Sequence, residues 1–260
     1  MQLYCFDGSF AGLLCCVFRA FQFKEFEVEI TTSQAGAHLN LFAEPIDIAT
    51  NEQQAERVWQ GLIKKLDKNA IRQIQRAFLS ESIVAHQHIF NYCVYVFQHQ
   101  YRVSSNYANP DVLGVAQWAK QVGREKHRME AFVRFKKTKQ GLYVALVSPD
   151  FNVLPLIERH FKARYQDQAW LIYDEKRDYG IYYDQDKVQQ VHMQVNTIDK
   201  NIENGFSQDF SLEMDEDEAL YDQLWKDYFR SVNIVERCNL KLHIQYVPKR
   251  YWRYLNEKEL

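Results

Sequence analysis

The stretch from residue 123 to residue 184 constrains the fold more than any other, because it alternates strand patterns with one short helical pattern. Two runs rich in aromatic and β-branched residues, 132–135 and 142–147, are separated by a turn sequence that contains Gly141. Such runs with a short glycine-containing link are typical of a β-hairpin. We therefore expect the first two strands of this stretch to pair with each other.

The second part of the stretch repeats this pattern after a helix. Residues 149–165 predict a turn and a short amphipathic helix, and residues 169–183 predict a second hairpin. Residues 188–195 alternate in the same way and would add one more strand. The sequence thus predicts an antiparallel ββαββ sheet region with one helix over residues 123–196.

The chain before this region is mainly helical in its pattern, over residues 1–122. Short strand patterns occur at residues 3–6 and 25–30. Apolar residues recur at helical spacing, often after a capping residue, in segments 9–21, 51–66, 67–79, 83–101 and 112–122. We expect an α+β protein with a helical N-terminal half.

Residues 197–260 are expected to form a linker and a C-terminal helical tail that packs on the rest of the chain. The linker is polar and contains Asn204 and Gly205, and a closing helix is predicted from about Asp215 to Val232. The last aromatic residues, 251–255, predict one or two helical turns.

Net charge gives no direct indication of a partner, because the 260 residues carry a formal charge of −2. The charge is nevertheless unevenly distributed: residues 209–227 are acidic, and residues 120–139 and 230–253 are basic. Binding to nucleic acid would therefore have to be local. The acidic segment is a candidate face for a protein partner.

Five cysteines without a CxxC spacing predict reduced thiols and a cytoplasmic protein. The apolar run at residues 10–18 is too short to span a membrane, and it has no basic leader. We therefore expect no membrane partner. The sequence has no GxxxxGK[ST], GxGxxG, HExxH or CxxxCxxC motif, so it predicts neither a cofactor nor a metal site.

Two short motifs each allow a structural and a functional interpretation. Asp7, Gly8 and Ser9 fit a tight turn with a helix cap, which we favour, or a phosphate-binding turn at a helix N-terminus. Asp150 or Asn152 is expected to cap the helix that follows. If the chain is an enzyme, its general acids and bases would come from His127, His160, Asp150 and Asp174.

The strongest functional signal is a basic run interleaved with aromatic residues at the start of the ββαββ region. On an extended strand, Arg134 and Lys136 would share a face with Phe132, a combination that suits phosphate contact and base stacking. The alternative is a solvated edge strand protected by its lysines. The residues expected to contact nucleic acid are Arg124, Arg128, Phe132, Arg134, Lys136, Lys137, Lys249, Arg250 and Arg253.

Seven passages of the chain resemble a bacterial family of unknown function that is associated with DNA metabolism and DNA repair. They are residues 4–14, 76–81, 127–135, 149–157, 170–174, 224–234 and 248–255, in the same order and across nearly the whole chain. The resemblance implies a radical-SAM protein as a partner. It also implies an association with uracil-DNA glycosylase, which is fused to some members. It supplies no catalytic residues.

Three hypotheses follow from the sequence. The leading one is a DNA-repair or DNA-metabolism accessory protein that binds nucleic acid and acts with a radical-SAM partner. The second is a DNA-modifying enzyme that uses the histidines and aspartates named above. The third is a protein-interaction adapter without DNA contact, for which the acidic segment at residues 209–227 would be the docking face.

Overall fold

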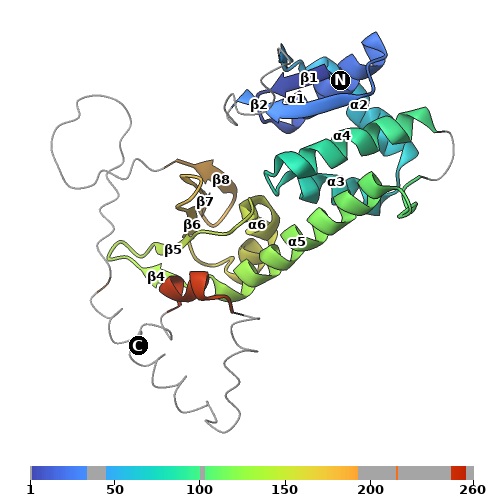
Figure 1. Cartoon of the computed structure of the whole chain (residues 1–260). Helices are drawn as coiled ribbons and strands as arrows, with labels where there is room; N and C mark the ends of the chain where they lie inside the picture. Colours follow the sequence, from blue (N-terminus) through green and yellow to red (C-terminus); the bar gives the residue numbers. More distant parts are fainter. Residues whose placement is uncertain (1, 34–44, 100–102, 193–214, 216–246, 256–260) are drawn as a thin grey trace, which may run out of the picture. The chain divides into compact units, whose positions relative to one another are not determined.

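The computed structural model describes residues 2–33, 45–99, 103–192, 215 and 247–255 (Figure 1). It confirms the α+β class, with helices concentrated in the N-terminal half and a strand-rich sheet in the C-terminal half. The chain forms two compact units, Met1–Arg124 and Glu125–Leu260. The boundary falls inside α5 (Pro110–Phe132), so each unit includes one part of that helix.

The N-terminal unit contains a small parallel sheet as well as helices. Its strands β1 (Gln2–Phe6), β2 (Val28–Thr32) and β3 (Ile46–Asp47) lie in the order β2-β1-β3. Both pairings are parallel, so the chain must cross back between β1 and β2, and α1 (Phe10–Phe23) makes that connection. The sequence predicted short strands in a mainly helical unit, but it did not predict that they form a parallel sheet.

The remaining helices of this unit are α2 (Glu52–Lys65), α3 (Lys68–Phe78) and α4 (Ile83–Gln98). Their starts agree with the predicted caps: Asn51 and Asp67 accept backbone N–H bonds at the starts of α2 and α3. Ser9 does the same for α1, accepting the N–H of Gly12 at 2.9 Å. The cap at Ser9 is confirmed, and phosphate binding at this turn remains a prediction.

The sheet of the N-terminal unit packs against α4 through aromatic side chains. Tyr4 and Phe6 of β1 meet Phe90 and His86 of α4, with ring centroids 6.5 and 5.7 Å apart. His86 also stacks on Phe78, and burial lowers the pKa of its imidazole. A neutral histidine is compatible with this apolar setting.

The predicted end of the fifth helix at residue 122 was wrong, because α5 continues to Phe132. Residues 123–132 contain no proline and are rich in Arg, Lys, Glu, Met and Ala, which favour a helix. Side-chain pairs at helical spacing, Lys126 with Glu130 and Arg128 with Glu125, add further support.

The C-terminal unit is built on a five-stranded sheet in the order β4-β5-β6-β7-β8. Its strands are β4 (Lys136–Lys137), β5 (Tyr143–Val147), β6 (Trp170–Asp174), β7 (Tyr179–Tyr183) and β8 (Val188–Val191). The second predicted hairpin and the further strand are present, whereas the strand predicted at residues 132–135 is not, and β4 at Lys136–Lys137 pairs with β5 in its place. The expectation of a wholly antiparallel sheet was wrong, because β5 and β6 are parallel. The helix α6 (Leu154–Arg164) connects them as a crossover.

The first strand of the predicted ββαββ region is much shorter than expected. Because α5 extends to Phe132, only Lys136 and Lys137 pair with β5. Phe132 is therefore the last residue of a helix and does not share a strand face with Arg134 and Lys136. The combination of ring and cations that we expected on one strand is not formed.

The tail ends in a short 3-10 helix, η3 (Lys249–Tyr254), which confirms the aromatic turns predicted there. The predicted linker and most of the predicted closing helix lie outside the described residues. Among the helices that the structure describes, none combines the length and apolar character needed to cross a bilayer.

Two glycines offer a matched test of this fold. A Cβ at Gly180 of β7 would lie 2.8 Å from the carbonyl oxygen of Ile172, so Gly180→Ala should lower the free energy of unfolding by about 1–3 kcal/mol. At Gly123 in α5, the nearest atom would be Arg76 Nη1 at 3.9 Å. Gly123→Ala should therefore raise that free energy by about 0.5–1 kcal/mol. Urea denaturation followed by circular dichroism measures both, and equal effects would contradict the two environments.

Candidate functional site

Charged residues gather where the parallel strands β5 and β6 end. Because the two strands run in the same direction, their carboxyl ends lie at one edge of the sheet. Residues 148–153 follow β5, and residues 175–178 follow β6, which ends at Asp174. We call these two loops the carboxyl edge. In open sheets with parallel strands, ligand sites occur at this end of the strands.

Asp174, the last residue of β6 before the second loop, has a buried carboxylate, with 0% of its surface exposed. Arg177 donates to Asp174 Oδ2 at 2.7 Å, and the backbone N–H of Lys176 donates to Oδ1 at 3.0 Å. The Arg177 guanidinium also donates to the carbonyl oxygens of Pro149 and Asp150, both at 3.1 Å. Asp174 thus positions an arginine that links the two loops of the carboxyl edge.

Glu125 of α5 is the second buried carboxylate, with 1% of its surface exposed. It accepts a hydrogen bond from the Tyr251 hydroxyl of η3 and another, at 2.8 Å, from the backbone N–H of Asp150. Arg128 and Arg250 approach the same carboxylate at 3.4 and 3.5 Å. One carboxylate therefore joins α5, the first loop of the carboxyl edge and η3.

The protonation of Tyr251 follows from these surroundings. Burial raises the pKa of its phenol well above the ordinary value, and the hydrogen bond to the Glu125 carboxylate raises it further. The phenol is consequently a neutral donor throughout the physiological range. Arg250 lies over the Tyr251 ring, 4.5 Å from its centroid.

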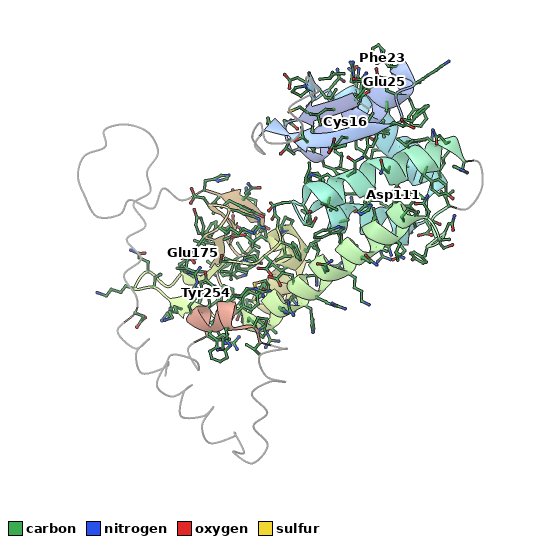
Figure 2. All side chains as sticks on the ribbon, viewed as in Figure 1. Cys16, Phe23, Glu25, Asp111, Glu175 and Tyr254 are labelled. Atoms are coloured by element: carbon green, nitrogen blue, oxygen red, sulfur yellow. The ribbon has the colours of Figure 1, made fainter. Side chains whose placement is uncertain are left out.

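Outside these buried carboxylates lies an exposed layer of arginines and tyrosines. Arg250 is 2.6 Å from Asp150, and Arg253 is 3.1 Å from Glu175. Tyr254 donates to Glu175 at 2.5 Å, and Figure 2 shows these two residues next to each other. Burial and the nearby Glu175 raise the pKa of Tyr254 to about 12. Arg253 remains 62% exposed and Arg250 41% exposed, so both guanidiniums are accessible to a ligand.

The structure brings together four of the residues expected to contact nucleic acid. Arg128, Arg250 and Arg253 contact carboxylates of this site, and Lys249 lies over the Trp252 ring of the same 3-10 helix. The two basic segments predicted to form separate surfaces thus meet at Glu125.

The other expected contact residues have different surroundings. Phe132 packs against the Tyr251 ring, with centroids 5.6 Å apart, so it takes part in anchoring η3. Arg134 donates to the carbonyl oxygens of Ala131 and Val133, and Lys137 is 3.1 Å from Asp215. Lys136 lies in β4, and Arg124 is the last residue of the N-terminal unit.

The four catalytic candidates fall into two separate groups. His127 and His160 each place Nδ1 near Glu130, at 3.8 and 3.7 Å, and His127 is 87% exposed. Asp150 and Asp174 instead contact arginines of the carboxyl edge. Within the part of the chain that the structure describes, no hydrogen bond or ion pair joins either histidine to either aspartate. The described residues also contain no group of three or more His, Cys, Asp or Glu that could hold a metal ion.

The expected capping role of Asp150 or Asn152 was wrong. The residue at the start of α6 is Val153, and it makes no side-chain cap. The Asp150 carboxylate pairs with Arg250, and Asn152 accepts a hydrogen bond from the Tyr179 hydroxyl.

Sequence reasoning missed Glu125, Arg177, Tyr251 and Glu175 as residues of the site. Glu125 and Arg128 stand three positions apart, a spacing that indicates a pair once the helix is known to continue past residue 122. Arg177 stands three positions after Asp174, but its contacts with Pro149 and Asp150 join separate segments. Tyr251 and Glu175 carried no comparable signal, because their contacts join segments far apart in the sequence.

The fold and the site define an α+β protein whose C-terminal sheet carries charged residues at the carboxyl ends of two parallel strands. The family description of a domain of unknown function, DUF4130, matches residues 84–257, which is more than half of the chain. The chain belongs to this family. Neither a curated protein nor a solved structure matches the chain.

Loss of single groups should show how strongly Glu125 holds the site together. Tyr251→Phe leaves the ring in place and removes one donor to a buried carboxylate, so it should lower the free energy of unfolding by about 1–3 kcal/mol. Glu125→Ala leaves the Tyr251 phenol and the Asp150 N–H without their acceptor and removes a carboxylate from Arg128 and Arg250, so it should cost about 3–5 kcal/mol. The matched control is Tyr182→Phe, with an expected change within about 0.5 kcal/mol. Urea denaturation measures all three, and equal values for the two tyrosine variants would contradict the network.

Alkaline pH offers a second test of the same contact. A group whose pKa is raised in the folded state stabilises the fold fully below its unfolded pKa, near 10 for tyrosine, and this stabilisation is lost as the pH rises. The wild-type free energy of unfolding should therefore begin to fall at about pH 10 and continue to fall as the pH rises toward the folded-state pKa of Tyr251. In Tyr251→Phe the fall should be shallower by up to about 1.4 kcal/mol per pH unit. Other tyrosines titrate equally in both proteins, so parallel curves would contradict the assignment.

Proposed function

We propose that this protein is a nucleic-acid-binding accessory protein of DNA repair or DNA metabolism that acts with a radical-SAM partner. The observation that carries the proposal is the meeting of basic residues from α5 and η3 at Glu125, beside the carboxyl edge. In the sequence these residues are more than a hundred positions apart.

The arginines suit contact with a phosphate backbone. A guanidinium donates in a planar fork that matches phosphate oxygens, and stacking on an aromatic ring limits its motion. Arg250 and Arg253 both lie over tyrosine rings, at 4.5 Å from the centroids. Glu125 additionally fixes Arg250 from the buried side. The side chains are therefore oriented before a ligand arrives.

The acidic partners of these arginines do not prevent such contact. Asp150 and Glu175 are 48% and 40% exposed, and exposed ion pairs of this kind contribute only about 0–1 kcal/mol. A phosphate group can replace either carboxylate at small cost. Glu125 is buried beneath and would keep its contacts with Tyr251 and the Asp150 N–H.

The biological context rests on the resemblance described above, which implies DNA repair, a radical-SAM partner and an association with uracil-DNA glycosylase. The separation of His127 and His160 from the two aspartates favours an accessory role over the enzyme hypothesis. The adapter hypothesis depends on residues 209–227, of which the structure describes only Asp215.

Removal of the exposed arginines should weaken DNA binding in a salt-dependent way. The double variant Arg250→Ala with Arg253→Ala should bind DNA with lower affinity, because counterion release from phosphates drives such binding. The slope of log affinity against log salt should become shallower by about 0.7–0.9 for each phosphate that the variant no longer neutralises. Fluorescence anisotropy with single-stranded, duplex and uracil-containing DNA at two salt concentrations measures both quantities.

Two further variants make this test specific. Arg72→Ala removes one exposed positive charge from the N-terminal unit and should leave affinity unchanged. Arg134→Glu with Lys136→Glu asks whether the β4 segment also contributes. Wild-type protein that binds none of the three DNA forms would refute the proposed function, and undiminished binding by the folded Arg250/Arg253 variant would refute the site.

A further inference from the structure

The 3-10 helix η3 carries the same pair of residues twice. Arg250 and Tyr251 are followed three positions later by Arg253 and Tyr254. Each guanidinium lies over the ring of the tyrosine that follows it, 4.5 Å from the centroid in both cases. The two arginines are thus held in the same way at two positions of one helix.

The geometry of a 3-10 helix sets the distance between these two positions. Such a helix has three residues per turn and rises about 2 Å per residue, so side chains three positions apart project from the same face about 6 Å from each other. Arg250 and Arg253 therefore present two cations on one face of η3 at this spacing.

Each arginine pairs with a carboxylate from a different loop of the carboxyl edge. Arg250 is 2.6 Å from Asp150, which follows β5, and Arg253 is 3.1 Å from Glu175, which follows β6. Figure 2 shows Glu175 beside Tyr254 of η3. The strands β5 and β6 are neighbours in the sheet, and neighbouring strands lie about 4.8 Å apart. The free protein thus places one anionic group on each of two cations that stand one helical turn apart.

The backbone of a nucleic-acid strand offers anions at a similar spacing. Successive phosphorus atoms are separated by six covalent bonds, which span at most about 7 Å, as two extended residues of a polypeptide do. The next phosphate along an extended strand is about twice as far away. Asp150 and Glu175 are 48% and 40% exposed, so both side chains can turn into water when phosphates approach the arginines.

We propose that Arg250 and Arg253 bind two successive phosphates of one DNA strand, and that Asp150 and Glu175 occupy these two phosphate positions in the free protein. The inference rests on the proposed function and names the part of the DNA that the site contacts. A single phosphate ion displaces only one of the two carboxylates, whereas a strand displaces both. The site therefore favours a continuous backbone over isolated phosphate.

The first experiment compares two single-stranded thymidine probes of about twelve nucleotides and equal net charge. Both contain the same number of neutral methylphosphonate linkages, which alternate with charged linkages in one probe and are grouped at one end of the other. The grouped probe should bind the whole protein at least about fivefold more tightly in fluorescence anisotropy, because it alone offers a phosphate to each arginine. This preference should fall below about twofold in Arg253→Ala, which retains one of the two cations. Arg72→Ala, in the N-terminal unit, should keep the wild-type preference.

The second experiment tests the two carboxylates. Asp150→Asn with Glu175→Gln preserves the size of both side chains and removes their charges, so the affinity for an unmodified thymidine strand should rise about three- to tenfold. The matched control is Asp167→Asn with Asp186→Asn, which removes two exposed carboxylates at the opposite edge of the sheet. The length of β6, about 17 Å, separates them from the arginines and exceeds the screening length of about 8 Å at about 0.15 M salt. The control should change the affinity by less than about twofold.

Failure of this inference and failure of the proposed function give different results. Wild-type protein that binds none of the three DNA forms refutes the proposed function. If DNA binds, equal affinities for the two probes, or a preference that persists in Arg253→Ala, would overturn the paired phosphate positions alone. Binding restricted to duplex DNA, or loss of binding to both probes, would have the same consequence, because two neighbouring phosphates on one strand should suffice.

Two further outcomes concern the variants themselves. Unchanged or weaker binding by the Asp150/Glu175 variant would overturn the role of the carboxylates. Should Arg253→Ala fail to fold, Arg253→Gln replaces it, since it keeps a long polar side chain over Tyr254 and removes the charge. It should lose the preference for the grouped probe in the same way.

Discussion

The C-terminal unit depends on the buried carboxylate of Glu125, which several donors contact at once. Glu125 is removed from water, so its negative charge must be balanced by the phenol of Tyr251, a backbone N–H and two guanidiniums. These donors come from three segments that are distant in the sequence. Because a buried charge without these donors would be costly, α5, the loop after β5 and η3 must assemble together.

The same arrangement explains why whole-chain charge was uninformative. The net charge of −2 is the sum of acidic and basic segments. It does not show which arginines pair with which carboxylates at the carboxyl edge. Asp174 faces inward and fixes Arg177, whereas Glu175 is partly exposed and contacts Arg253. The adjacent residues Asp174 and Glu175 thus have different effects. Asp174 positions Arg177, which bonds to backbone carbonyl oxygens, and Glu175 partly neutralises the exposed guanidinium of Arg253.

Much of the fold could be predicted from local patterns, because capping and periodicity act over a few residues. Ser9, Asn51 and Asp67 indicated helix starts correctly. The parallel pairing of β5 with β6 could not be predicted in this way, since a hairpin-like spacing says nothing about which strands become neighbours. The end of α5 was missed because the basic residues after Gly123 suggested a strand, while their pairs with Glu125 and Glu130 favour a helix. The site was the hardest part to predict, as its central contacts join residues more than a hundred positions apart.

The parallel pairing of β5 with β6 has a consequence for the order in which the sheet forms. Each residue of β5 pairs with a residue of β6 that is 27 positions further along the chain, whereas β6 and β7 are joined by a short turn. Closing a longer loop costs more chain entropy, and this cost precedes the contacts that offset it. The β6-β7 hairpin is therefore expected to form before β5 joins it.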